Sequence, residues 1–155
     1  MHQHDYHVQV TWTGNQGSGT RDYRAYSRDH DIEIAGKATL QGSADPAFLG
    51  DAGRHNPEDM LVASLSACHM LWYLHLCAEA RIVVEDYTDQ AQGSMALTSS
   101  GGGHFTQVTL RPRVTVSGDS DAQLAERLHE RAHALCFIAN SVNFPVTCEP
   151  RIVLQ

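Results

Sequence analysis

Apolar and polar residues alternate with a period of two over two segments near the N-terminus, residues 5–13 and 22–34. This pattern is typical of strands that have one buried and one exposed face. Residues 14–20 (GNQGSGT) between them are typical of a turn, so the two segments predict an antiparallel β-meander. Residues 35–55 have weak periodicity and contain Gly, Pro, Asp and Ser, and we expect a long loop there.

A helical pattern begins after Asn56. Asn56 is a favourable N-cap and Pro57 suits the first helical position, while the carboxylates of Glu58 and Asp59 complement the positive end of the helix dipole. No Gly or Pro follows as far as about Ala80, which predicts one long helix. Its expected apolar face contains Leu61, Leu65, Cys68 and Trp72. A helix this apolar is expected at the centre of the fold or at a subunit contact.

The second half of the chain predicts strands on either side of another helix. The expected elements are a strand with a weak middle at 81–98, a turn at 99–104, a strand at 105–118, a helix at 121–139 and a strand at 146–154. Asp119, Ser120 and Asp121 supply the start of that helix. Its predicted apolar stripe is Leu124, Leu128, Leu135 and Ile138. The order β-β-β-α-β-β-α-β indicates one α+β domain over residues 1–155, with antiparallel sheets.

Composition excludes several classes of protein. Of the 155 residues, 42% are hydrophobic and 19% charged, which argues against disorder. The net charge of -7 argues against nucleic-acid or anionic-membrane partners, because both require a dense basic patch. No apolar run approaches the roughly 20 residues of a membrane span, and the N-terminus does not resemble a signal peptide. We therefore expect a cytoplasmic protein, whose cysteines are free thiols, metal ligands or redox catalysts.

The four cysteines fall on three predicted elements. Cys68 and Cys77 share the first helix, where nine residues separate them by about 13 Å, too far for a disulfide. Cys136 belongs to the second helix and would face Cys68 if the two helices pack together. Cys77 and Cys148 are interpreted as small buried hydrophobic residues.

His129 and His133 are four residues apart on the second predicted helix, a spacing that can hold zinc. No Glu follows the first His, so this is not the HExxH arrangement. Such a pair on an amphipathic helix is more often a solvated edge than a ligand pair. We therefore expect neither a metal nor a cofactor.

Two motifs resemble one known family. HNPEDMLVASLSACHMLWYL, residues 55–74, resembles the central helix of the OsmC/Ohr family, which includes organic hydroperoxide resistance proteins and osmotically inducible protein C. AHALCFIANSVNFPV, residues 132–146, is similar to the family's second cysteine segment. The resemblance implies an OsmC/Ohr-like fold, with a β-meander, a long central helix and a C-terminal β-β-α-β segment, in an intertwined homodimer. Phe137 stands where most peroxidase members have Pro.

The resemblance also implies a reaction. Cys68 would reduce an organic hydroperoxide and become a sulfenic acid, Cys136 would close a disulfide with it, and an external dithiol would reopen that disulfide. An apolar helix alone would leave Cys68 unreactive, so a cation is needed beside it. Arg24 and Arg21 are the first candidates, because they lie in a segment similar to the arginine-bearing loop of the family. Arg28 and Arg54 are the alternatives.

Glu58 would hold that arginine in place. It lies about 15 Å along the helix from Cys68, too far to reach the sulfur from the same helix. If Glu58 acts at the site, it therefore comes from a second subunit, although a plain helix-start carboxylate would also explain its position.

The sequence is compatible with three functions. The first is a thiol peroxidase, in which Leu65, Leu71, Trp72 and Phe137 would favour organic peroxides over hydrogen peroxide. The second is a non-catalytic protein of the same fold that binds a small apolar ligand in the dimer groove. The third is a metal-binding protein that uses His129, His133 and a thiol.

Overall fold

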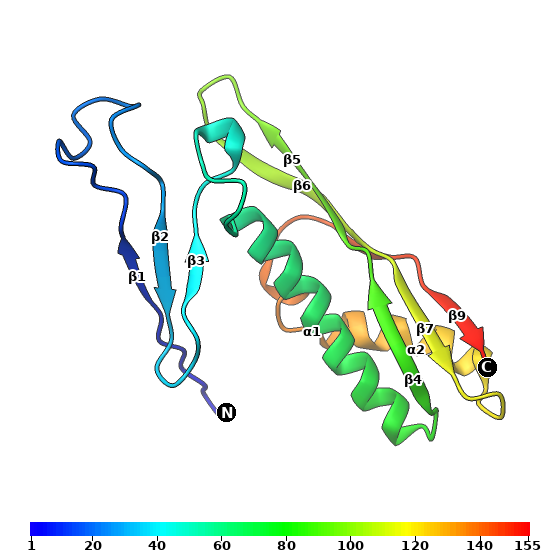
Figure 1. Cartoon of the computed structure of the whole chain (residues 1–155). Coiled ribbons are helices and arrows are strands. Elements are labelled where there is room, and N and C mark those ends of the chain that lie inside the picture. The colour runs from blue at the N-terminus through cyan, green and yellow to red at the C-terminus, as the bar shows by residue number, and fades with distance from the viewer. The chain divides into compact units, whose positions relative to one another are not determined.

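The computed structural model describes residues 1–155, which form two compact units, Met1–Met60 and Leu61–Gln155. The N-terminal unit contains a three-stranded antiparallel sheet (Figure 1). Its strands are β1 (Gln9–Trp12), β2 (His30–Glu33) and β3 (Leu40–Gly42), with β2 in the middle. A 3-10 helix, Pro46–Phe48, follows the sheet. The predicted meander is thus present, and the third strand of the predicted order lies inside the segment expected to be a loop.

Most of the predicted strand at 22–34 is not a strand, and the Arg28 side chain binds two of its backbone carbonyls. The guanidinium donates hydrogen bonds to the carbonyl oxygens of Tyr26 and Tyr23, at 2.7 and 2.6 Å. It also lies over both tyrosine rings, 3.9 and 4.5 Å from their centroids. Two tyrosines of the alternating segment thus contact one arginine, and only the end of the segment joins the sheet as β2.

Helix α1 (Pro57–Glu79) begins and ends as its sequence dictates. The Asn56 side chain accepts a hydrogen bond from the Asp59 amide at 2.8 Å, which confirms the predicted N-cap. At the other end Arg81 has a φ of 60°, and the amides of Arg81 and Ile82 donate to the carbonyls of Ala78 and Cys77. This is the Schellman closure, here with an arginine in the position that usually holds glycine.

The length and composition of α1 would also allow it to cross a membrane, contrary to the expectation that no segment is apolar enough. A core helix meets the same criterion. Four residues at successive intervals of four are buried along one face of α1: Leu65, His69, Tyr73 and Cys77. The predicted apolar face is therefore wrong. Of its four residues only Leu65 is fully buried, whereas Leu61, Cys68 and Trp72 are half-buried.

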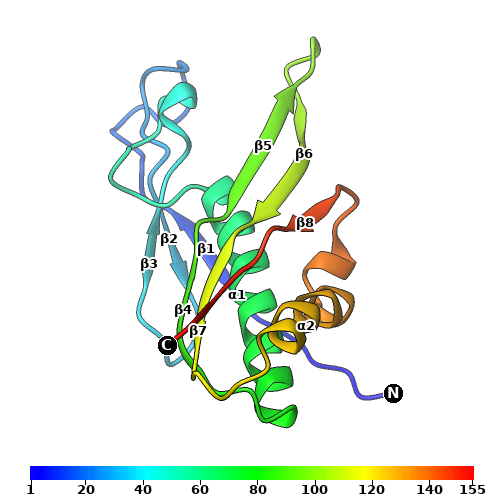
Figure 2. The same cartoon turned by 90° about the vertical axis from the view of Figure 1, so that its right-hand side faces the viewer.

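The C-terminal unit has two three-stranded sheets, built by three chain segments that each contribute one strand to each sheet (Figure 2). One sheet has the order β4 (Val84–Asp89), β7 (Pro112–Val116), β9 (Arg151–Leu154), and the other β5 (Gln92–Leu97), β6 (Gly103–Leu110), β8 (Val146–Cys148). The pairs β6–β8 and β7–β9 are parallel, so the sheets are mixed and not wholly antiparallel as predicted. Each long predicted strand is broken where its chain passes between sheets.

Asp89, at the break between β4 and β5, forms hydrogen bonds with helix α1 and with the break between β6 and β7. One carboxylate oxygen accepts a hydrogen bond from the Arg111 amide at 2.7 Å, and the other accepts from the Ser66 hydroxyl at 2.5 Å. The third segment is bonded to the second at its own break, because the Glu149 amide, between β8 and β9, donates to the carbonyl of Leu110 at the end of β6, at 2.9 Å. Asp89 is therefore where two of the three crossing strands and the central helix are held together.

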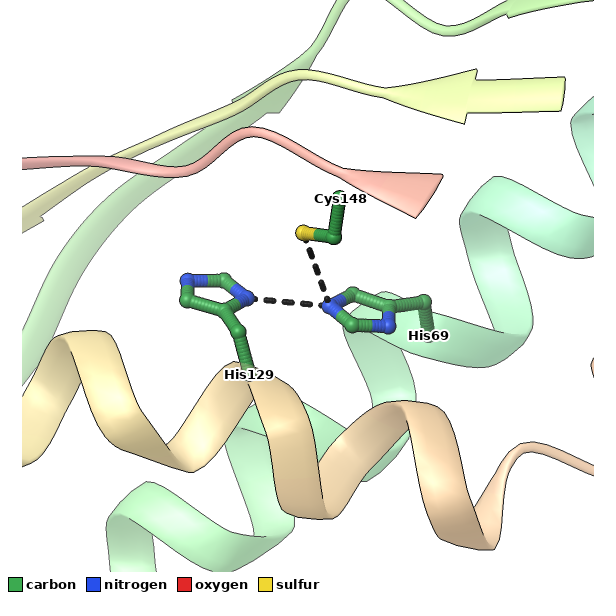
Figure 3. Close-up of side chains that lie close together, drawn as sticks. All are labelled: His69, His129 and Cys148. Carbon is green, nitrogen blue, oxygen red and sulfur yellow. Dashed lines mark hydrogen bonds between the residues drawn. The ribbon is translucent and has the colours of Figure 1, made fainter. Parts of the chain in front are cut away.

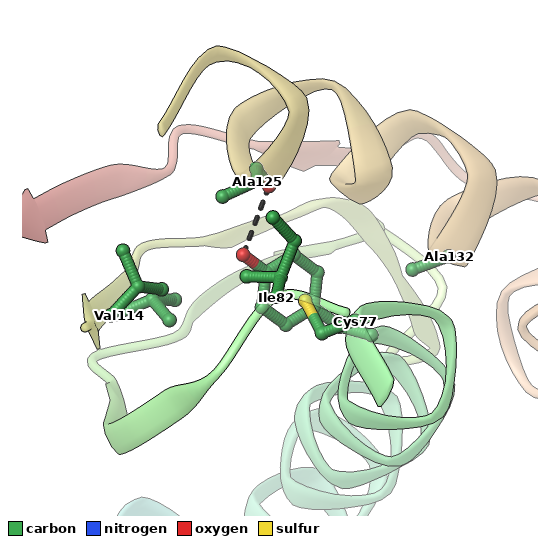
Figure 4. Close-up of a cluster of buried hydrophobic side chains, with 7 residues drawn as sticks. Cys77, Ile82, Val114, Ala125 and Ala132 are labelled. Atoms are coloured by element: carbon green, nitrogen blue, oxygen red, sulfur yellow. Dashed lines mark hydrogen bonds between the residues drawn. The ribbon is translucent and has the colours of Figure 1, made fainter. Parts of the chain in front are cut away.

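Helix α2 (Ala122–Leu135) packs against α1 and β7 through a cluster of buried side chains (Figure 4). The Asp121 side chain caps it by accepting from the Leu124 amide at 3.0 Å. The fully buried residues of α2 are Ala125, His129 and Ala132, whereas the predicted Leu124 and Leu128 are half-buried. The helix stops at Leu135, and Cys136 follows it in an extended conformation.

We expect Asp89→Ala to destabilise the protein by about 1–3 kcal/mol, because an amide and a hydroxyl lose a charged acceptor. Urea unfolding measures the free energy of unfolding. Asp86→Ala is the matched control, because Asp86 is exposed on the same strand and should change the stability by less than about 0.5 kcal/mol. Equal losses for both variants would contradict the role assigned to Asp89.

Candidate functional site

The structure brings two of the predicted site residues together. Cys68 lies on α1 and is half-buried, and Cys136 lies directly after α2 and is 1% exposed. The Cys68 side chain is near enough to Cys136 to influence its pKa. All four cysteines are free thiols. We call Cys68 and Cys136 the thiol pair.

The two thiols of the pair differ in their surroundings. Burial raises the pKa of Cys136 to about 11; a hydrogen bond from the Ala139 amide opposes this shift, and the neighbouring Cys68 adds to it. The Ala139 nitrogen is 3.4 Å from the Cys136 sulfur. Cys136 therefore stays protonated at neutral pH. A Cys136 thiolate, the nucleophilic form of a thiol, is disfavoured there.

A shallow apolar pocket of about 290 Å³ lies next to Cys136 along the chain, lined by Leu71, Trp72, His75 and Phe137. Phe137 is 67% exposed and meets the Trp72 ring edge-to-face, with centroids 5.4 Å apart. We call this the Trp72 groove. Leu65, predicted to belong to the same surface, instead lies fully buried in the core with Val108 and Leu110.

Glu58 lies in the N-terminal unit, where it lines a cavity of about 330 Å³ together with Arg28. Trp12, Tyr26 and Phe48 supply apolar walls. The two arginines favoured by the sequence are elsewhere in this unit: Arg21 and Arg24 are exposed and form no ion pair. The structure thus associates Glu58 with Arg28, an arginine that the sequence left as an alternative.

Arg54 is the other alternative, and two carboxylates hold it. Its Nε lies 3.5 Å from Asp29 and 3.7 Å from Asp51. One terminal nitrogen of its guanidinium is buried without a hydrogen-bond partner. Arg54 therefore retains an unused donor one residue before His55, where the family motif begins.

A second polar cluster in the C-terminal unit joins residues from α1, α2 and β8 (Figure 3). His69 Nε2 lies 2.9 Å from His129 Nδ1 and 3.7 Å from the Cys148 sulfur. Burial lowers the pKa of His69 to about 4 and that of His129 to about 3, so both rings are neutral at neutral pH. Burial also raises the pKa of Cys148 to about 12.

This cluster corrects several expectations. His129 is 2% exposed and stacks on the Tyr73 ring, so it is not part of a solvated edge, whereas His133 is exposed. Cys77 is a buried core residue as predicted. His69 was not predicted, although its spacing of four from both Leu65 and Tyr73 places it on their face of the helix.

A family model described as OsmC-like protein matches residues 50–151. The chain belongs to the OsmC family. An OsmC-like protein of unknown function from Vibrio cholerae has 38% identity to this OsmC-family chain, with a TM-score of 0.87 over 96% of this chain and 99% of its own. The predicted α+β, OsmC/Ohr-like fold is thereby confirmed.

Two more distant proteins are also similar to this chain. An organic hydroperoxide resistance protein OsmC from Legionella pneumophila is 19% identical, with a TM-score of 0.70 over 98% of both chains. The uncharacterized protein YmaD of Bacillus subtilis is 23% identical over 146 residues, which is 92% of this chain and 89% of YmaD.

We expect iodoacetamide to modify Cys68 before Cys136 in the native protein at neutral pH. Cys136 is buried, and because its pKa is raised, its thiolate becomes populated only as the pH increases toward about 11. Peptide mapping by mass spectrometry after timed alkylation measures the order. Buried Cys77 is the internal reference and should stay unmodified until the protein unfolds. Modification of Cys136 ahead of Cys68 would contradict this difference.

Proposed function

We propose that the chain is a thiol-dependent peroxidase that reduces organic hydroperoxides, in oxidative stress defence. The observation that carries the proposal is the thiol pair: Cys68 is half-buried, Cys136 is buried, and Cys68 is near enough to Cys136 to influence its pKa. Relatives described as organic hydroperoxide resistance proteins support the choice of substrate. In this proposal both units act as one OsmC-like domain.

The first step takes place at Cys68. Its thiolate attacks one peroxide oxygen, so that a sulfur–oxygen bond forms while the oxygen–oxygen bond breaks. Two electrons pass from the sulfur to the peroxide, and the leaving alkoxide takes a proton to become an alcohol. The sulfur is left as a sulfenic acid.

The second step uses Cys136. Its sulfur attacks the Cys68 sulfenic acid, a disulfide forms, and the hydroxide that leaves combines with the Cys136 proton as water. The raised pKa of Cys136 suits this order, because a protonated thiol does not compete with Cys68 for the peroxide. An external dithiol then reduces the disulfide and becomes oxidised itself.

The Trp72 groove supports a preference for organic over hydrogen peroxide. Leu71 and Phe137 are more than 60% exposed, and a bulky alkyl or aryl group would cover them on binding. Burying this surface yields about 25 cal/mol for each Å², a gain that hydrogen peroxide cannot obtain.

We further propose an intertwined homodimer that delivers Glu58 and an arginine to the thiol pair of the partner subunit. Helix α1 is continuous from Pro57 to Glu79, so Glu58 stays about 15 Å from Cys68 of its own chain. Arg28 is the first candidate for the cation, because it lines the same cavity as Glu58. Arg24 and Arg21 remain the candidates from the sequence. A guanidinium beside the sulfur would stabilise the thiolate and the leaving alkoxide.

One equivalent of cumene hydroperoxide should remove two alkylatable thiols from the reduced protein, and peptide mapping should assign them to Cys68 and Cys136. Cys136→Ser should stop at a Cys68 sulfenic acid that dimedone traps, and Cys68→Ser should not react. Cys77→Ser is the matched control and should react like the native protein. Four free thiols after exposure, or faster reaction with hydrogen peroxide, would contradict the proposal.

We expect Arg28→Gln to slow the oxidation of Cys68 by about 100-fold, because the transition state loses a positive charge. Stopped-flow fluorescence of the tryptophans, with cumene hydroperoxide in excess, measures the rate. Arg21→Gln and Arg24→Gln are the comparison variants. If the oxidation rate falls only in Arg21→Gln or Arg24→Gln, the cation comes from the exposed loop and not from Arg28. If the rate falls in none of the arginine variants, Arg54→Gln included, the mechanism uses no arginine.

The second candidate function is a non-catalytic protein that binds a small apolar ligand. The observation in its favour is Phe137, which stands where most peroxidase members have Pro and forms a wall of the Trp72 groove. Unreactive thiols together with quenching of tryptophan fluorescence by an apolar ligand would support it.

A further inference from the structure

The proposed peroxidase does not use the second polar cluster, formed by His69, His129 and Cys148 (Figure 3). His69 and His129 are 1% and 2% exposed, and the three candidate ligand atoms lie within 4.8 Å of one another. Three different elements supply them, namely α1, α2 and β8, so the cluster forms only when the C-terminal unit folds.

Hydrogen bonding alone leaves this cluster incompletely satisfied. The bond between the two rings uses one proton, and the outer nitrogens, His69 Nδ1 and His129 Nε2, have no partner. Whichever ring donates, one buried N–H group remains without an acceptor, which is unfavourable. Filling the core therefore does not by itself account for this cluster.

We propose that His69, His129 and Cys148 form a binding site for Zn²⁺. A tetrahedral zinc ion with bonds of about 2.0 Å to nitrogen and 2.3 Å to sulfur holds two nitrogens about 3.3 Å apart and each about 3.5 Å from the sulfur. The observed separations from His69 Nε2 are 2.9 Å to His129 Nδ1 and 3.7 Å to the sulfur, and all three ligand atoms lie within 4.8 Å of one another. An opening of the ring pair and an approach of the Cys148 sulfur to His129 would accommodate the ion.

Charge also favours a divalent cation here. Binding replaces the Cys148 proton, which leaves to solvent, so the ion and the thiolate together carry one positive charge. The negative charge of the Asp89 carboxylate acts on both His69 and Cys148. The thiolate and Asp89 together therefore balance the two charges of the zinc ion.

An entry path leads to the cluster from the side of α2. A pocket of about 620 Å³ is lined by His129 and Cys148, and Glu126, Arg127, Glu130 and His133 are on its wall. Its two carboxylates outweigh the one guanidinium and would attract a cation, and its water would fill the fourth coordination position. Because no protein group accepts a hydrogen bond from the outer nitrogens, the affinity should be 10–100-fold weaker than in a fully supported site.

Titration of metal-free native protein with Co²⁺ tests the site, because a cobalt–thiolate bond produces a near-ultraviolet charge-transfer band. We expect one Co²⁺ per chain, displacement by Zn²⁺, and a higher melting temperature with Zn²⁺. Cys148→Ser and His129→Gln should lose the band, and circular dichroism should confirm that each variant is folded. Cys148→Ala replaces Cys148→Ser if the serine variant unfolds.

The matched control is the double variant Cys68→Ser and Cys136→Ser, which should keep the charge-transfer band while it loses the reaction with hydroperoxide. His133→Gln should also keep the band, because His133 is not among the three ligands. Absence of the band in the native protein, or a band that survives Cys148→Ser, would overturn the zinc site. A band lost in the double variant would do the same, because the metal would then lie at the thiol pair.

Discussion

The burial of one face of α1 is the constraint on which both candidate sites depend. Leu65 and Tyr73 are fully buried on this face, with His69 between them at intervals of four residues. Because successive residues of a helix are about 100° apart, burial of His69 turns Cys68 to a neighbouring side of the helix. One helical turn thus presents a thiol toward Cys136 and an imidazole toward α2 and β8. A rotation of α1 about its axis would disrupt both arrangements.

Much of this architecture could be predicted from local sequence chemistry. Asn56 and Asp121 cap the two helices as expected, because capping needs only a side-chain oxygen within three residues of its amide donor. The meander and the fold class followed from period-two patterns and a long uninterrupted helix. Cys68 and Cys136 were selected by motif, and the structure adds that their side chains are neighbours. Their catalytic roles remain proposals.

The features that could not be predicted arise from tertiary contacts. The buried face of α1 includes His69, a polar residue that no hydrophobic pattern assigns to a core, and its partners lie 60 and 79 residues away. Strand β3 has three residues, too few to show a period. The breaks between β4 and β5 and between β6 and β7 depend on the Asp89 hydrogen bonds, which join residues far apart in sequence. Arg28 was left as an alternative because the family resemblance favoured Arg21 and Arg24, whereas the cavity that Arg28 shares with Glu58 is set by folding.

The passage of three chain segments between the two sheets of the C-terminal unit limits how this unit can open. Each sheet is covalently continuous with the other through all three of its strands. Local opening in proteins proceeds in contiguous cooperative blocks. Neither sheet can form such a block alone, because releasing its strands pulls on those of its neighbour. Slowly exchanging amides in both sheets should therefore share one opening free energy, and the C-terminal unit behaves as a single foldon.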